Sequence, residues 1–108
     1  MAPETIVRAA QAMDNAVAAA KTAGEPFATR VRREALSTRN AILLHWNECL
    51  AFCKTQGIPW VWGDTRQQAA SAWIADCKAF GVRTVRETTA EEAPAQFKKY
   101  CDNLLSPN

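Results

Sequence analysis

Apolar residues recur along most of this chain at spacings of three and four, which is the repeat of an α-helix with one buried face. The first such segment covers residues 3–23, and the second covers residues 26–56. A third covers residues 64–81, and a fourth covers roughly residues 90–105. The pattern predicts an all-α fold, built as a bundle of four main helices.

The boundaries of these segments carry residues that are typical of helix ends. Pro3 suits a first helical turn, because its missing N–H would have no partner there. Gly24 and Gly57 suit the left-handed conformation that closes a helix. Asp64, followed three residues later by Gln67, has the spacing of a capping box. These residues predict where the first three helices begin or end.

The second segment is unusually long, and an unbroken helix over residues 26–56 would extend about 45 Å. Ser37 could instead cap a new helix and break the run near Leu36. We favour one long helix, with or without a bend. Its apolar stripe consists of Phe27, Val31, Leu36, Leu43, Trp46, Leu50 and Cys53, with Ile42 and Cys49 alongside.

The fourth helix and the connections are less regular. Pro94 would remove a hydrogen bond from a helix interior, so we expect the regular helix to start at Ala93. Short extended segments are predicted around residues 59–62 and 82–86. A sheet made of two such short segments would be only marginally stable, so the fold class stays all-α.

Composition narrows the class of protein further. The chain has 108 residues, 48% hydrophobic and 22% charged, which fits a single globular domain and argues against disorder. Its net charge is +2 and its pI is about 8.4, below the range typical of nucleic-acid binders. There is no apolar run long enough to span a membrane, and the N-terminal segment lacks the features of a secretory signal.

The stretch "HWNECLAFC" places His45, Cys49 and Cys53 on one face of a helix. Two of these side chains on neighbouring turns could chelate a metal ion. All three lie too far apart along the helix to bind one ion, so Cys77 and Cys101 from other helices would have to complete the site. Both cysteines of the stretch continue an apolar stripe, and buried cysteine acts as a small hydrophobe. We therefore interpret these residues as core packing and expect neither a bound metal nor a cofactor.

Disulfide bonding is the alternative for the cysteines. Cys49 and Cys53 are poorly placed to pair within one helix, whereas Cys53–Cys77 or Cys49–Cys101 could form if their Cα atoms came within about 7 Å. Four cysteines allow three pairings, so the state of the thiols stays open. His45 is the only histidine and lies in apolar surroundings, so we expect no catalytic Cys–His pair.

Two tryptophans and one basic cluster are the remaining candidates. Trp60 and Trp62 alternate along an extended segment, so we expect them to point to opposite sides. Exposed tryptophans serve protein interfaces or stack on sugars, and the alternative is a hydrophobic cover over the helix ends. In "TRVRRE", Arg30 and Arg33 share a helix face, which we interpret as a solvated face with local ion pairs rather than a phosphate site.

Three stretches, "APETIVRAAQAMDNAVAAA", "RVRREALSTRNAILLHW" and "WIADCKAFGVRTVRE", resemble the helical region that follows the barrel in large bacterial glycoside-hydrolase-like proteins. That barrel is catalogued as a domain of unknown function and is related to α-glucuronidases and β-hexosaminidases. The matching positions are Pro3, Glu4, Arg30, Val31, Arg32, Leu36, Trp46, Trp73, Gly81, Val82 and Glu87.

The resemblance implies a non-catalytic accessory domain, residues 1–108, excised from a larger protein. The catalytic carboxylates of such proteins lie in the barrel, so no catalytic residue is expected in this chain. The expected partner is the barrel of the parent protein or a second copy of the domain. The resemblance also implies that the parent is secreted or periplasmic.

Two alternative functions remain open. The stretch "STRNAILLHWNECLAFCKTQG" resembles the helical core-binding domain of tyrosine recombinases through Thr38, Phe52 and Cys53. It covers only about a fifth of the chain and lacks the dense Lys/Arg face of a DNA-binding module. A small phage or plasmid protein that binds another protein is the third hypothesis.

Overall fold

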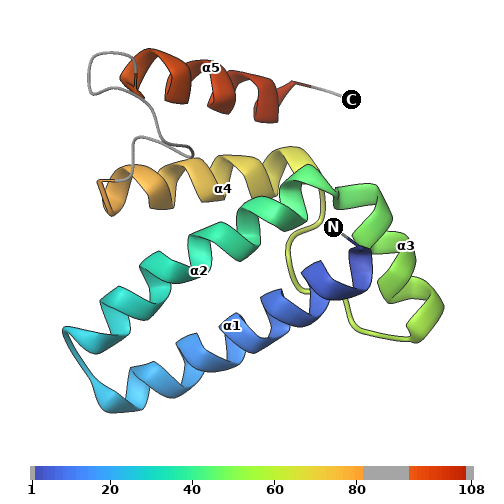
Figure 1. Cartoon of the computed structure of the whole chain (residues 1–108), viewed down its shortest axis with the longest axis horizontal. Helices are drawn as coiled ribbons and strands as arrows, with labels where there is room; N and C mark the ends of the chain where they lie inside the picture. The colour runs from blue at the N-terminus through green and yellow to red at the C-terminus, as the bar shows by residue number, and fades with distance from the viewer. Residues whose placement is uncertain (1, 82–92, 107–108) are drawn as a thin grey trace. The chain divides into compact units, whose positions relative to one another are not determined.

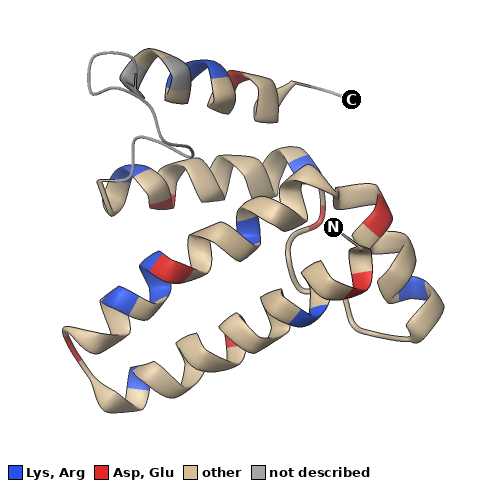
Figure 2. Ribbon diagram, viewed as in Figure 1, with Lys and Arg blue, Asp and Glu red and all other residues tan. Residues whose placement is uncertain are grey.

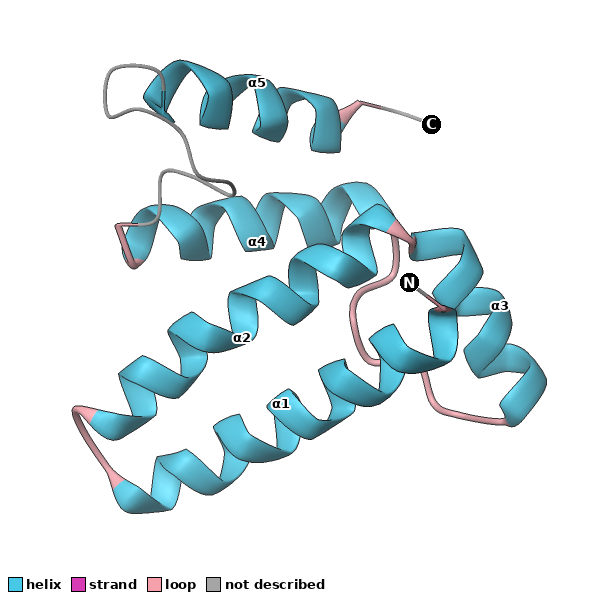
Figure 3. Cartoon of the chain, in the orientation of Figure 1, coloured by secondary structure: helices cyan, strands magenta, loops and turns pink. Residues whose placement is uncertain are grey.

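The computed structural model describes residues 2–81 and 93–106, and their regular structure is entirely helical (Figures 1 and 3). The helices are α1 (Pro3–Ala23), α2 (Phe27–Leu44), α3 (Trp46–Gln56), α4 (Arg66–Ala79) and α5 (Ala93–Leu105). The predicted all-α class is confirmed. The predicted number of four helices is wrong, because the described residues form five. No strand occurs at residues 59–62, and residues 82–86 lie outside the described part of the chain.

The chain divides into two compact units, Met1–Gly63 and Asp64–Asn108. The first contains α1, α2 and α3, and the second contains α4 and α5. The single domain over residues 1–108 stays a prediction.

In the first unit, α1 and α2 form an antiparallel hairpin (Figure 1). Pro3 occupies the start of α1 as predicted. Gly24 ends α1, its N–H donating to the Ala20 carbonyl at 3.1 Å. Its backbone lies at φ +83° and ψ −175°, outside the left-handed helical conformation predicted for it, although the positive φ still favours glycine. Near this turn Ala20 packs with Ala28 and Val31, and these small side chains allow the two helices to approach closely.

The long second helix is broken, and the break lies at His45 rather than near Ser37. His45 has φ −121° and ψ 36°, and it separates α2 from α3. Ser37 stays inside α2, where its hydroxyl donates to the Glu34 carbonyl at 3.1 Å. The prediction of one continuous helix is therefore wrong.

The length of α1 explains this break. With 21 residues, α1 extends about 31 Å, so a straight helix of about 45 Å would run well past its end. Instead α3 turns back beside the N-terminal part of α1 (Figure 1). This buries Trp46, Cys49 and Cys53 at 8%, 0% and 1% exposure. Leu50, which was predicted to be part of the apolar stripe, is left 39% exposed.

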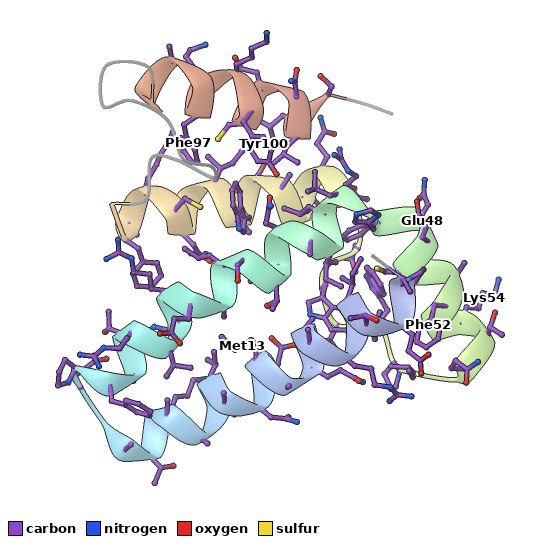
Figure 4. All side chains as sticks on the ribbon, viewed as in Figure 1. Met13, Glu48, Phe52, Lys54, Phe97 and Tyr100 are labelled. Atoms are coloured by element: carbon purple, nitrogen blue, oxygen red, sulfur yellow. The ribbon has the colours of Figure 1, made fainter. Side chains whose placement is uncertain are left out.

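In the second unit, α4 and α5 run antiparallel (Figure 1). The Arg66 guanidinium donates to the Leu104 carbonyl at 2.8 Å, which places the start of α4 against the end of α5. The Trp73 ring on α4 lies 6.3 Å from Phe97 and 6.1 Å from Tyr100 on α5, measured between ring centroids (Figure 4). Aromatic pairs at these distances contribute to the apolar contact between the two helices.

The capping residue predicted for α4 is wrong by one position. Thr65, not Asp64, precedes the helix, and its hydroxyl accepts from the Gln68 N–H at 3.1 Å. Gln67 does not reach back to form a capping box, because its side chain donates to the Leu105 carbonyl of α5 at 3.0 Å. The start of α5 at Ala93 agrees with the prediction.

Candidate functional site around Trp62

The four cysteines are buried and form no disulfide. Cys49 and Cys77 are 0% exposed, Cys53 is 1% exposed and Cys101 is 8% exposed. Burial raises the pKa of Cys49, Cys53 and Cys101, because a thiolate is poorly solvated in an apolar interior. The pKa of Cys49 is raised further by its neighbours Cys53 and Glu48. Such thiols are poor nucleophiles and pack as small apolar side chains.

No disulfide joins the four cysteines. Cys49 and Cys53 lie one turn apart on α3, a placement within one helix that suits a disulfide poorly.

His45 does not join the cysteines in a site. Its Nδ1 atom lies 3.3 Å from Oε2 of Glu48, which is labelled in Figure 4. Both side chains are substantially exposed. Among residues 2–81 and 93–106, no group of three or more His, Cys, Asp or Glu side chains is arranged to hold a metal ion.

Trp60 and Trp62 lie in the segment after α3, residues 57–63, which we call the tryptophan loop. The Trp60 ring contacts Trp46 at 4.9 Å and Trp62 at 5.1 Å between centroids, with interplanar angles of 82° and 79°. Both pairs have the edge-to-face arrangement that aromatic quadrupoles favour. The prediction that Trp60 and Trp62 point to opposite sides is therefore wrong.

Hydrogen bonds to both indole groups explain why these rings meet. Trp60 Nε1 donates to the Gly63 carbonyl at 2.8 Å, which folds the loop back on itself. Trp62 Nε1 donates to Oδ2 of Asp14 on α1 at 3.1 Å. The second bond joins residues 48 positions apart and ties the loop to the helical hairpin.

Asp14 is the residue that sequence reasoning missed. It is exposed on α1 and continues no motif, so no local signal marks it. Partial burial raises the pKa of its carboxyl group, while the Trp62 hydrogen bond and the positive charge of Arg39 on α2 oppose that rise. Asp14, Arg39 and Trp62 thus come from three different elements of the first unit; we call them the Trp62 site.

The basic cluster lies on α2, where Figure 2 draws Lys and Arg in blue, and the exposure of its residues agrees with a solvated helix face. Arg30 and Arg33 are exposed on α2. Arg32 donates to the Glu25 carboxylate at 3.4 Å and to the Thr29 hydroxyl at 3.1 Å. Hydrogen bonds from Thr29 lower the pKa of Glu25, and the nearby Arg32 adds to that effect. Arg32 therefore makes local contacts with its own helix and the preceding turn.

Four large apolar side chains are exposed in the described structure. They are Phe27 at 51%, Leu44 at 52%, Leu50 at 39% and Val61 at 66%. Val61 stands out because it lies between the two half-buried tryptophans of the loop. None of the helices in the described ranges combines the length and hydropathy that crossing a bilayer requires.

The chain matches no protein-family model, no curated protein and no solved structure with which it was compared.

Proposed function

We propose that this chain is a non-catalytic helical accessory domain of a carbohydrate-active, glycoside-hydrolase-like protein. Its role is to pack against the catalytic barrel of the parent protein or to dimerise. The proposal rests first on the sequence resemblance to the helical region that follows such barrels. An all-α chain without strands in its described residues is compatible with that region.

The observation that carries the packing role is the exposed surface of the tryptophan loop. Val61 is 66% exposed, and Trp60 and Trp62 beside it are half-buried. Single exposed apolar residues are ordinary on protein surfaces. A valine flanked by tryptophans on a hydrogen-bonded loop is more specific, because rigid aromatic groups dominate the energetics of interfaces. This surface supports a role in contacting another protein.

Two arrangements among the described residues support the non-catalytic part of the proposal. Within the described residues, His45 lies beside Glu48, and the thiols are buried with raised pKa values where a shift is resolved. Nucleophilic catalysis needs an accessible nucleophile within hydrogen-bonding reach of a base. We expect the isolated chain to show no turnover of aryl glycosides, and measurable turnover would contradict this part of the proposal.

The packing role is tested in two stages. The coding sequence around this chain is determined first, and a barrel-coding segment upstream in the same reading frame is the expected result. The barrel is then co-expressed with the chain, and association is measured by co-purification and light scattering. A reading frame without a barrel would contradict the link to a glycoside-hydrolase-like parent.

A charged substitution in the loop identifies the surface used. Val61→Asp places a carboxylate in the middle of the apolar surface, so we expect it to lower association with the barrel or with a second copy. Thr55→Asp, at an exposed position on α3, introduces the same charge away from the loop and is the matched control. Equal association of the two variants would show that the tryptophan loop is not the interface.

A further inference from the structure

The Trp62 site brings together three kinds of chemical group that the sequence keeps far apart. Trp62 contributes an indole ring that is half-buried, and Asp14 contributes an exposed carboxylate. Arg39, a half-buried residue of α2, contributes a guanidinium whose positive charge lowers the pKa of Asp14. An aromatic surface with a few convergent polar groups is the usual composition of a small-molecule site.

These groups match the chemistry of a sugar. The C–H face of a pyranose ring is apolar and can lie against an indole, whereas its hydroxyl groups need acceptors and donors. A carboxylate accepts hydrogen bonds from hydroxyls, and a guanidinium donates to hydroxyl oxygens. We propose that Asp14, Arg39 and Trp62 form a binding site for a neutral saccharide. This inference rests on the proposed function and names a ligand class for it.

The existing hydrogen bond holds the site in place. Trp62 Nε1 donates to Oδ2 of Asp14, which fixes the indole relative to α1. A carboxylate has about four lone-pair positions, so Asp14 can accept further hydrogen bonds while it holds Trp62. The edge-to-face contact with Trp60 restrains the other side of the loop. Fixing these groups before binding reduces the entropy lost when a ligand is bound.

Charge selects a neutral ligand over an acidic one. The carboxylate of Asp14 and the guanidinium of Arg39 carry opposite charges, so the site has no net charge to attract an anion. Partial burial raises the pKa of Asp14, which indicates that the carboxyl group has already lost part of its hydration. A sugar hydroxyl therefore displaces less water from Asp14 than from a fully hydrated carboxylate.

The test uses the full 108-residue chain labelled with ¹⁵N. Maltose, cellobiose, lactose and N,N′-diacetylchitobiose are added separately, up to about 100 mM, while amide and indole N–H signals are followed by NMR. We expect at least one disaccharide to shift the signals of Trp62 and of the α1 amides near Asp14, with a Kd in the millimolar range typical of weak sites. If none of the four sugars shifts these signals, the site does not exist.

Two substitutions and one matched control locate the binding. Asp14→Asn removes the charge but keeps an acceptor for Trp62, so we expect binding to weaken about tenfold through loss of a charged hydrogen bond. Asp64→Asn makes the same change at an exposed aspartate outside the site and is expected to bind like the unmodified chain. Trp62→Ala removes the ring and should abolish binding. If Trp62→Ala fails to fold, the Asp14→Asn and Asp64→Asn pair decides, and equal affinities would overturn the proposal.

The outcome is separate from that of the accessory-domain proposal. No sugar binding, together with a barrel-coding segment in the same reading frame, would remove the saccharide site and leave the packing role. Sugar binding without a barrel would keep the site and remove the link to the parent protein. Val61→Ala provides an internal check, because it changes the apolar loop surface and should leave sugar binding unchanged.

Discussion

The hydrogen bond between Trp62 and Asp14 leads to the most specific prediction about stability. Trp62→Phe removes the indole N–H that donates to Oδ2 of Asp14 at 3.1 Å but keeps an aromatic ring beside Trp60. A hydrogen bond to a charged group contributes roughly 1.5–3 kcal/mol when it is buried. Asp14 is exposed, so solvent screening reduces that contribution. We expect an interaction free energy of about 0.5–1 kcal/mol between the two side chains.

A double-mutant cycle isolates this interaction from other effects of each substitution. Urea unfolding of the unmodified chain, Trp62→Phe, Asp14→Asn and the double variant supplies the four free energies of unfolding. The loss in the double variant should be smaller than the sum of the two single losses. Additive losses, with no difference outside the measurement error, would refute the claim that this bond ties the loop to α1.

Folding raises the pKa of Asp14, and this shift makes the stability of the chain depend on pH. Its folded-state pKa lies above the ordinary value of 3.8, so the folded chain binds more protons than the unfolded chain between these two values. The contribution of Asp14 to the free energy of unfolding therefore falls as pH rises through that interval. Because the Trp62 bond lowers the pKa, Trp62→Phe should raise it further in an NMR titration, and a lower pKa in the variant would contradict the assignment.

Three further predictions concern other parts of the chain. The four buried thiols should be nearly unreactive toward Ellman's reagent in the folded chain and react fully in urea, whereas rapid reaction without denaturant would contradict their burial. Gly57→Ala should lower the free energy of unfolding by about 1 kcal/mol, because Gly57 has φ +69°, a conformation that alanine adopts only with strain. A new Cβ would meet no atom within 4 Å, so the backbone alone causes the loss, and an unchanged stability in urea would refute this argument. The chain should not change the mobility of duplex DNA in a gel even at low salt, because Arg32 is paired with Glu25 and the remaining basic residues on α2 are sparse. A salt-dependent change in mobility would instead favour the recombinase-like hypothesis.

The fold class and several helix ends were accessible from the sequence because they depend on local physics. Spacings of three and four place apolar residues on one side of a helix whatever lies opposite, so the burial of Leu36 and Leu43 in the second segment was predicted correctly. Pro3 and Gly57 act through their own backbone conformations, and both lie at the helix ends where they were expected.

The break at His45 and the cap at Thr65 were missed because they depend on tertiary contacts. No glycine or proline marks the end of α2; the chain turns there because α1 is too short to cover a continuous helix. Asp64 and Gln67 have the spacing of a capping box, but Gln67 bonds to the end of α5 instead. In both places a partner distant in sequence outweighs the local preference.

The sequence determined only part of the candidate site, and the tertiary structure determined the rest. The sequence by itself marked Trp60 and Trp62 as candidates, because they alternate along a short segment between two predicted helices. Only the tertiary structure decided that their rings touch each other and that Trp62 bonds to Asp14, a residue 48 positions away. Helical periodicity reports which side of one element is apolar, whereas a contact across 48 residues depends on how three elements pack together, and no local pattern encodes that arrangement.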